Sequence, residues 1–241
     1  NAKIKMQLFY QPDFEQNATN IVFDANESKH MFKVLRKQAG DLIKVTNGRG
    51  LLAEGKISII TQKQCIVNVS GFEFKRKKDF YIHIAISPTK SNDRFEWFLE
   101  KATEIGIDEI TPILTEHSER KKLKLDRGER VIQAAMKQSL KLYKPKLNAL
   151  TKLDDLLNIA KEDEKFIAHC EDSQYKKQLI TSCKKQKSYL VLIGPEGDFS
   201  PQEIEKAITK NYKEVSLSEE RLRTETAAIV STHSLNICQL L

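Results

Sequence analysis

The chain has 241 residues, which is enough for two modest domains, because a domain usually holds about 100–150 residues. Apolar residues make up 40% and charged residues 30% of the sequence, as in ordinary globular proteins. No apolar run approaches the roughly 20 residues that a membrane span needs, and the N-terminus lacks the apolar stretch of a signal peptide. We therefore expect a cytoplasmic protein that is not attached to a membrane.

The net charge is +7, from 40 Lys and Arg residues against 33 Asp and Glu residues. Basic residues gather in three places, at 75–78, at 120–124 and along 137–146. One such run is usually a solvated surface, but three in a chain of this size favour a polyanionic partner such as nucleic acid.

The cysteines and histidines show no pattern of metal ligands. Cys65, Cys170, Cys183 and Cys238 are scattered, so we expect reduced, mostly buried thiols and no disulfide. The five histidines form no ligand motif, and we expect no bound metal.

The first part of the chain has the pattern of a small β domain. Short segments rich in β-branched and aromatic residues alternate with turn formers such as Asn47-Gly48-Arg49-Gly50, as in a small β-barrel. The polar, basic segment 73–79 predicts the domain boundary. Strands are expected at 7–10, 21–23, 41–45, 51–60 and 65–69, and one helix is expected at 28–37.

From residue 80 the pattern changes to alternating strands and helices. This alternation predicts a parallel sheet covered by helices on both faces. Strands are expected at 81–87, 110–114, 165–169, 189–193 and 214–217, and helices at 94–105, 126–142, 153–161, 174–184 and 227–240.

A Gly-Pro-Glu-Gly turn, residues 194–197, follows the buried strand that ends at Ile193. Ser200, Pro201 and Glu203 then give a capping box with a proline at the first helical position. Ligands of parallel sheets bind at the carboxyl ends of strands, so this turn is a candidate ligand site, with a purely structural turn as the competing interpretation. The chain has no phosphate-loop motif and no G-x-G-x-x-G fingerprint, which argues against a nicotinamide-dependent oxidoreductase.

A second polar loop, with Arg221 and Arg223, leads from the strand ending at Leu217 into the last helix. Thr224 or Thr226 is the expected cap of that helix. The helix is apolar on one side, so it should pack against the core or against another subunit.

These motifs together resemble the RsmE family, bacterial 16S ribosomal RNA methyltransferases that modify uridine at N3. The matching blocks are His30…Val34-Leu35-Arg36…Gly40-Asp41, Arg94…Lys101-Ala102-Thr103-Glu104…Gly106, Gln138-Ser139…Pro145, Gly194 to Ser200, and Leu217 to Ala227. The chain departs from the family at a few positions. Asp198 and Ser218 stand where the family usually has glycine, and Lys137, Leu140 and Lys141 replace the usual Glu, Gly and Arg.

The resemblance implies an α/β fold in two parts. Residues 1–74 would form a PUA-like RNA-binding β-barrel, and residues 80–241 a SPOUT-type methyltransferase domain with a C-terminal trefoil knot. The family also implies a homodimer, S-adenosyl-L-methionine as the cofactor, and 16S ribosomal RNA or the assembled small subunit as the partner.

Site residues follow from the same resemblance. Arg223 is expected to stabilise the uracil anion, and Glu225 to act as the base or to orient Arg223. The RNA-binding residues would be Lys29, Lys33, Arg36 and Lys141. The cofactor-binding residues would be His169, Glu171, Leu192, Gly194, Glu196, Gly197, Leu217, Ser218 and Leu222.

Two alternatives remain open at this point. One is a SPOUT methyltransferase that acts on transfer RNA or on a ribose 2′-oxygen, against which the His30–Arg36 block argues. The other is a non-catalytic RNA-binding or ribosome-assembly factor that keeps the fold, against which the intact 194–197 and 223–227 blocks argue.

Overall fold

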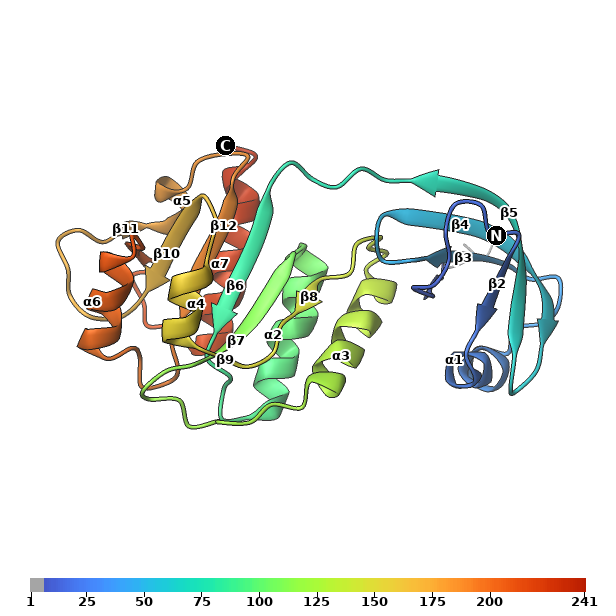
Figure 1. Cartoon of the computed structure of the whole chain (residues 1–241), viewed down its shortest axis with the longest axis horizontal. Coiled ribbons are helices and arrows are strands. Elements are labelled where there is room, and N and C mark those ends of the chain that lie inside the picture. Colours follow the sequence, from blue (N-terminus) through green and yellow to red (C-terminus); the bar gives the residue numbers. More distant parts are fainter. Residues whose placement is uncertain (1–6) are drawn as a thin grey trace. The chain divides into compact units, whose positions relative to one another are not determined.

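The computed structural model describes residues 7–241; the first six residues, on which the expectation of no signal peptide rests, lie outside the described part. The chain divides into two compact units, the first formed by residues up to 77 with 136–144, and the second by 78–135 with 145–241 (Figure 1). No helix in the described part of the chain is both long and apolar enough to cross a membrane.

The first unit is built on a five-stranded sheet in which the strands follow the order β1-β3-β4-β5-β2. β1 runs parallel to β3, and the other pairs are antiparallel. Alternate residues of these strands, such as Phe9, Ile21 and Val67, are buried in one apolar core. The strands are β1 (Leu8–Tyr10), β2 (Asn20–Phe23), β3 (Leu42–Thr46), β4 (Leu51–Ile60) and β5 (Cys65–Phe74).

The helix of the first unit consists of α1 (Ala25–Lys29) and a π-helical turn, η1 (His30–Val34). It begins earlier than the expected residue 28 because the Asp24 carboxylate caps it, accepting the Glu27 N–H at 2.8 Å. It also ends before the expected residue 37, because Arg36 adopts a left-handed backbone with φ of 52°.

The second unit contains a parallel sheet with the strand order β11-β13-β10-β12-β6-β7-β8, with β9 paired to β7. All the strand pairs in this sheet are parallel, which confirms the predicted α/β class. The strands are β6 (Tyr81–Ile86), β7 (Glu109–Leu114), β8 (Lys146–Leu147), β9 (Thr151–Lys152), β10 (Glu164–Ala168), β11 (Lys177–Gln178), β12 (Ser188–Ile193) and β13 (Lys213–Ser216).

Helices cover both faces of this sheet, as the alternation predicted (Figure 1). Phe98 of α2 and Leu235 of α7 pack in the apolar layer on one face, and Leu156 of α4 and Ile204 of α6 pack in the layer on the other. The helices are α2 (Asn92–Ile105), α3 (Leu125–Gln138), α4 (Leu153–Ile159), α5 (Leu179–Ser182), α6 (Pro201–Thr209) and α7 (Thr224–Cys238).

Three helix predictions for the second unit were also wrong in extent. The helix expected at 126–142 stops at Gln138, because Leu140 has a φ of 57°. In place of a helix over 174–184 the chain forms β11, paired to β13, and only the short α5. The last helix begins three residues earlier than expected. Its N-cap is Arg223, with no side-chain cap, so the expected threonine cap was also wrong.

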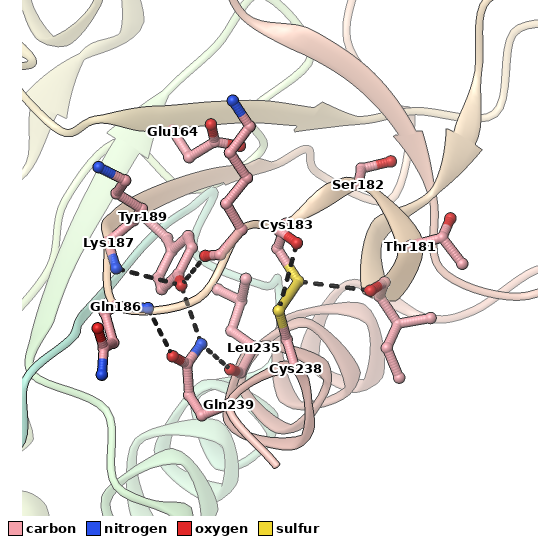
Figure 2. Close-up of a disulfide and its surroundings, with 12 residues drawn as sticks. Glu164, Thr181, Ser182, Cys183, Gln186, Lys187, Tyr189, Leu235, Cys238 and Gln239 are labelled. Carbon is pink, nitrogen blue, oxygen red and sulfur yellow. Dashed lines mark hydrogen bonds between the residues drawn. A yellow bond between two sulfur atoms is a disulfide. The ribbon is translucent and has the colours of Figure 1, made fainter. Parts of the chain in front are cut away.

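Cys183 and Cys238 form a disulfide, so the expectation of reduced thiols was wrong for these two residues (Figure 2). Their Cα atoms lie 6.7 Å apart although the residues are 55 positions apart in the sequence. The pair arises because the end of α5 packs against the end of α7, which no local sequence pattern reveals. Cys65 is buried and free, and Cys170 is exposed and free.

Candidate active site

A pocket of about 770 Å³ lies in the second unit at the carboxyl ends of β10, β12 and β13. Its walls are the three loops that leave these strands, with residues from 168–172, 193–198 and 215–224. Carboxyl ends of neighbouring parallel strands meet at one edge of a sheet, which is why loops far apart in sequence converge here. The pocket brings together these predicted site residues: His169, Gly194, Glu196, Leu217, Ser218, Leu222 and Arg223.

Four other predicted residues do not line the pocket. The Leu192 side chain is fully buried in the layer beneath α4 and α6, and Glu171 is exposed outside the pocket. Gly197 lies in the turn, where its carbonyl oxygen is 3.1 Å from Nδ1 of His117. Glu225 is buried on α7 and faces Arg94.

The turn after β12 is packed so closely that few other side chains would fit in it. A Cβ atom on Gly194 would lie 3.1 Å from the Phe199 ring, so a side chain there would displace that ring. The predicted capping box is confirmed: the Ser200 N–H donates to Glu203 Oε2 at 3.0 Å, and the Glu203 N–H donates to Ser200 Oγ at 3.4 Å. The box fixes the start of α6 and thereby the end of the pocket turn.

Asp198 also lines the pocket and was not among the predicted site residues. It has a φ of 62°, and its two carboxylate oxygens accept the N–H groups of Phe199 at 2.8 Å and Cys170 at 2.7 Å. The second bond ties the 194–198 turn to the loop after β10. The only sequence signal was that an acidic residue replaces the glycine usual in the family.

His169 follows β10 directly, with its side chain almost completely buried, and its Nε2 atom lies 3.1 Å from Glu214 Oε1. Burial, and after it the charge of Lys176, lowers the pKa of this histidine, which keeps the ring neutral at pH 7. Nε2 then carries the proton toward the carboxylate, and Nδ1 is left as an acceptor without a partner among the described residues.

Lys176 is another pocket residue that the sequence reasoning missed, because a helix was expected there. Its ammonium group donates to the carbonyl oxygens of His169 at 2.9 Å and Glu171 at 2.5 Å. The lysine therefore holds the loop after β10 in a closed turn.

The polar loop before α7 places two exposed arginines, Arg221 and Arg223, in the pocket lining. Glu225, in the first turn of α7, lies 3.7 Å from the guanidinium of Arg94 on α2. An apolar cleft with always-charged guanidinium groups at its rim can hold a neutral ring system and stabilise a negative charge that develops beside it.

The predicted RNA-binding residues lie in the first unit. Lys29, Lys33 and Arg36 are exposed on or just after the α1–η1 helix. Lys141 is half-buried, and burial together with the charge of Lys75 lowers its pKa. No described residues form a group of His, Cys, Asp and Glu side chains that could hold a metal ion.

Two family models match the chain. Residues 76–236 match the RNA methyltransferase domain, and residues 23–70 match the RNA methyltransferase PUA domain. Similar curated proteins include the ribosomal RNA small subunit methyltransferases E of two bacteria. The one from Mesomycoplasma hyopneumoniae is 32% identical over 64% of this chain and 67% of its own length. The one from Buchnera aphidicola is 27% identical over 98% and 94%.

Solved structures agree with this. A probable rRNA-methyltransferase from Porphyromonas gingivalis is 39% identical and superposes with a TM-score of 0.88 over 98% of this chain and 99% of its own. A structure from Legionella pneumophila, assigned as a methyltransferase and holding the cofactor SAM, is 28% identical with a TM-score of 0.87 over 97% and 98%. The chain therefore belongs to the RNA methyltransferase family, in the group of the bacterial ribosomal RNA small subunit methyltransferases E that its motifs resemble.

Proposed function

We propose that this protein transfers a methyl group from S-adenosyl-L-methionine to N3 of a specific uridine in 16S ribosomal RNA of the small subunit. The observation that carries the proposal is the pocket at the strand ends, where the 194–198 turn and the 217–223 loop converge in a chain of this family. The names of the curated relatives support the substrate, and the Legionella structure with bound SAM supports the cofactor.

In this proposal the cofactor occupies the 770 Å³ pocket. Leu217 and Leu222 supply apolar surface for its adenine ring, and His169 lines the same pocket. Gly194 lines the pocket without a side chain, so its backbone can approach the ligand closely. The Leu192 side chain points into the core, so its contribution is a backbone one, and Glu171 and Gly197 act by shaping the loops.

The bound cofactor supplies an electrophilic methyl group, and the protein must align the acceptor nitrogen with it. Uracil N3 carries a proton at neutral pH, so the nitrogen becomes negatively charged as it loses that proton, and the charge spreads to the flanking carbonyl oxygens. Arg223 lines the pocket and is exposed, so its guanidinium can meet those oxygens. Glu225 faces Arg94, which favours an orienting role at the start of α7 over the role of base.

The same proposal covers the finer architecture. Residues 1–74 act as the PUA-like RNA-binding part, and residues 80–241 act as the methyltransferase part except for 136–144, which pack in the first unit. Lys29, Lys33, Arg36 and Lys141 of the first unit contact phosphates. The C-terminal segment is threaded into a trefoil knot. This is supported by the position of β13 between β10 and β11 and by the packing of α7 against α2 and β6.

A homodimer is supported by apolar residues of α7 that stay partly exposed, such as Val230.

A methyl-transfer assay with labelled S-adenosyl-L-methionine tests the proposed function. The substrates are small ribosomal subunits, and separately their naked RNA, from a strain that lacks this gene, followed by nucleoside analysis. N3-methyluridine is the expected product. Label on transfer RNA or on a ribose would overturn the substrate, and absence of both transfer and cofactor binding would overturn the enzymatic proposal.

A further inference from the structure

A second pocket, of about 470 Å³, lies between α2 and the start of α3 in the second unit. We call it the α2–α3 groove. Four of the side chains that line it are cationic, and one, Glu96, is anionic. The lining residues are Asn92, Phe95, Glu96, Leu99, Arg120, Lys122, Leu123, Lys124, Arg127 and Gly128.

The positive charge of the groove is only partly compensated. Glu96 forms an ion pair with Arg127. The distance is 2.5 Å between Oε1 and Nε, and 3.0 Å between Oε2 and Nη2. Within residues 7–241 no carboxylate pairs with Lys122 or Lys124, and both are exposed. Two free ammonium groups beside a hollow attract an anion more strongly than ion-paired ones do.

The guanidinium of Arg120 is held in place before any ligand arrives. It donates to the side-chain oxygen of Asn92 at the start of α2, and to the carbonyl oxygen of Lys90 at 2.7 Å. An arginine fixed in this way loses little conformational entropy when it binds a phosphate.

A single residue links the groove to the pocket at the strand ends. The carbonyl oxygen of Lys90 accepts from Arg120, which lines the groove, while its N–H donates at 3.1 Å to Glu196, which lines the pocket. The end of the groove at Arg120 therefore lies close to the part of the pocket wall that holds Glu196.

We propose that the α2–α3 groove binds the phosphodiester backbone of the substrate RNA next to the nucleotide that is methylated. The inference rests on the proposed function in taking RNA as the polyanion. Four cationic side chains, from Arg120 to Arg127, line the groove, as binding of a polyanion requires, and the partly exposed side chain of Leu123 offers an apolar contact for a ribose or base. In this proposal the second unit binds a segment of the RNA directly, in addition to the segment that the first unit binds.

The test is a double variant, Lys122→Gln with Lys124→Gln, which changes two exposed side chains that pair with no carboxylate in the described part of the chain. RNA affinity is measured by filter binding over a series of salt concentrations, cofactor affinity by calorimetry, and methyl transfer by steady-state kinetics. The matched control is Lys161→Gln with Lys185→Gln, which removes the same charge from exposed positions outside the groove. Circular dichroism checks that both variants are folded.

The groove variant should bind RNA about tenfold more weakly. The slope of log affinity against log salt should fall by roughly 1.4, because each single-strand phosphate contact contributes about 0.7. KM for RNA should rise about tenfold, while kcat and cofactor affinity should not change. The control variant should bind and methylate RNA as the unmodified protein does. RNA affinity and slope equal to the control would overturn the proposal.

A loss confined to assembled subunits, with naked RNA bound normally, would also overturn the proposal and assign the groove to a protein contact. Failure of the proposed function gives a different result, because the unmodified protein would then transfer no methyl group to any RNA whatever the groove binds.

Discussion

The carboxylate of Asp198 accepts a hydrogen bond from the backbone N–H of Cys170 over 2.7 Å, joining the turn after β12 to the loop after β10. Asp198 does this from a left-handed backbone, φ 62°, at the position where the family usually has glycine. A non-glycine residue is strained in that conformation, and aspartate is one of the few side chains that tolerate it. Its second oxygen bonds the N–H of Phe199, so the carboxylate offsets the strain with two local bonds.

Replacing Asp198 should therefore weaken cofactor binding in a graded way. Asp198→Asn keeps an oxygen acceptor and should change the dissociation constant least. Asp198→Gly relieves the backbone strain but loses both bonds. Asp198→Ala loses the bonds and keeps the strain, and we expect about a tenfold weaker affinity, the loss of one or two hydrogen bonds to a charged acceptor. Titration calorimetry with S-adenosyl-L-methionine measures the series, and an alanine variant that binds as tightly as the glycine variant would contradict this account.

The sequence predicted those features that depend on local patterns. The capping box at Ser200 and Glu203 needs only residues three positions apart, and the parallel sheet follows from the alternation of apolar segments. The residues at which helices and turns end were harder to predict. Leu140 and Asp198 both have left-handed backbones, although neither is a glycine. The family usually has glycine at both positions, so the family pattern indicated a conformation that these two side chains do not suggest.

Features that join distant segments could not be predicted in this way. The bond between Asp198 and Cys170 and the pair of Glu225 and Arg94 depend on where the sheet edge places the loops. Propensity and spacing say nothing about such contacts until the strand order is known. For the same reason the resemblance identified the two loops of the pocket but did not separate Leu217, which lines it, from Leu192, which points into the core.

The disulfide between Cys183 and Cys238 should make stability depend on the redox conditions. It closes a loop of 55 residues, and the loss of chain entropy in the unfolded state would stabilise the fold by up to about 4 kcal/mol. Cys183→Ser should lower the free energy of unfolding by that order, measured by denaturant titration without reductant. Dithiothreitol should lower it in the unmodified protein and leave the variant unchanged.

The reduced protein should remain folded, because the end of α7 is also held by hydrogen bonds (Figure 2). Gln239 donates to the Tyr189 hydroxyl at 2.9 Å and accepts the Gln186 N–H at 2.9 Å. Cys170→Ser is the control, since that thiol is exposed and unpaired. Equal sensitivity to dithiothreitol in the unmodified protein and Cys183→Ser would show that the bond does not stabilise the fold.

Glu109 should make the protein sensitive to acid. Burial would raise the pKa of its carboxyl group, but the Asn148 amide, His83, Lys146 and the Tyr81 hydroxyl act in the opposite direction and lower it to about 2. A carboxyl group with an ordinary pKa of about 4.5 in the unfolded chain then contributes stability above that pH, and this contribution is lost as the pH falls toward 2. Between about pH 6 and about pH 3 the loss should be about 2 kcal/mol.

Glu109→Gln should remove most of this slope, so its free energy of unfolding should fall less on acidification than that of the unmodified protein. Denaturant titrations at several pH values measure it. Glu205→Gln, which changes an exposed carboxylate on α6, is the control and should keep the full slope. Parallel pH profiles for the Glu109 variant and the unmodified protein would contradict the assignment.

Arg223 should affect the rate of methyl transfer more than binding. If its guanidinium stabilises the charge on the uracil oxygens, Arg223→Ala should lower kcat by about 100- to 1,000-fold, the range for removing one donor to a developing anion, with cofactor affinity nearly unchanged. Arg223→Lys keeps the charge but loses the planar fork, so it should recover only part of the rate. Arg221→Ala is the matched control, since Arg221 is an exposed arginine in the same pocket lining. Equal losses of kcat in the two alanine variants would mean that the pocket needs positive charge in general, and that Arg223 has no particular position opposite the reacting base.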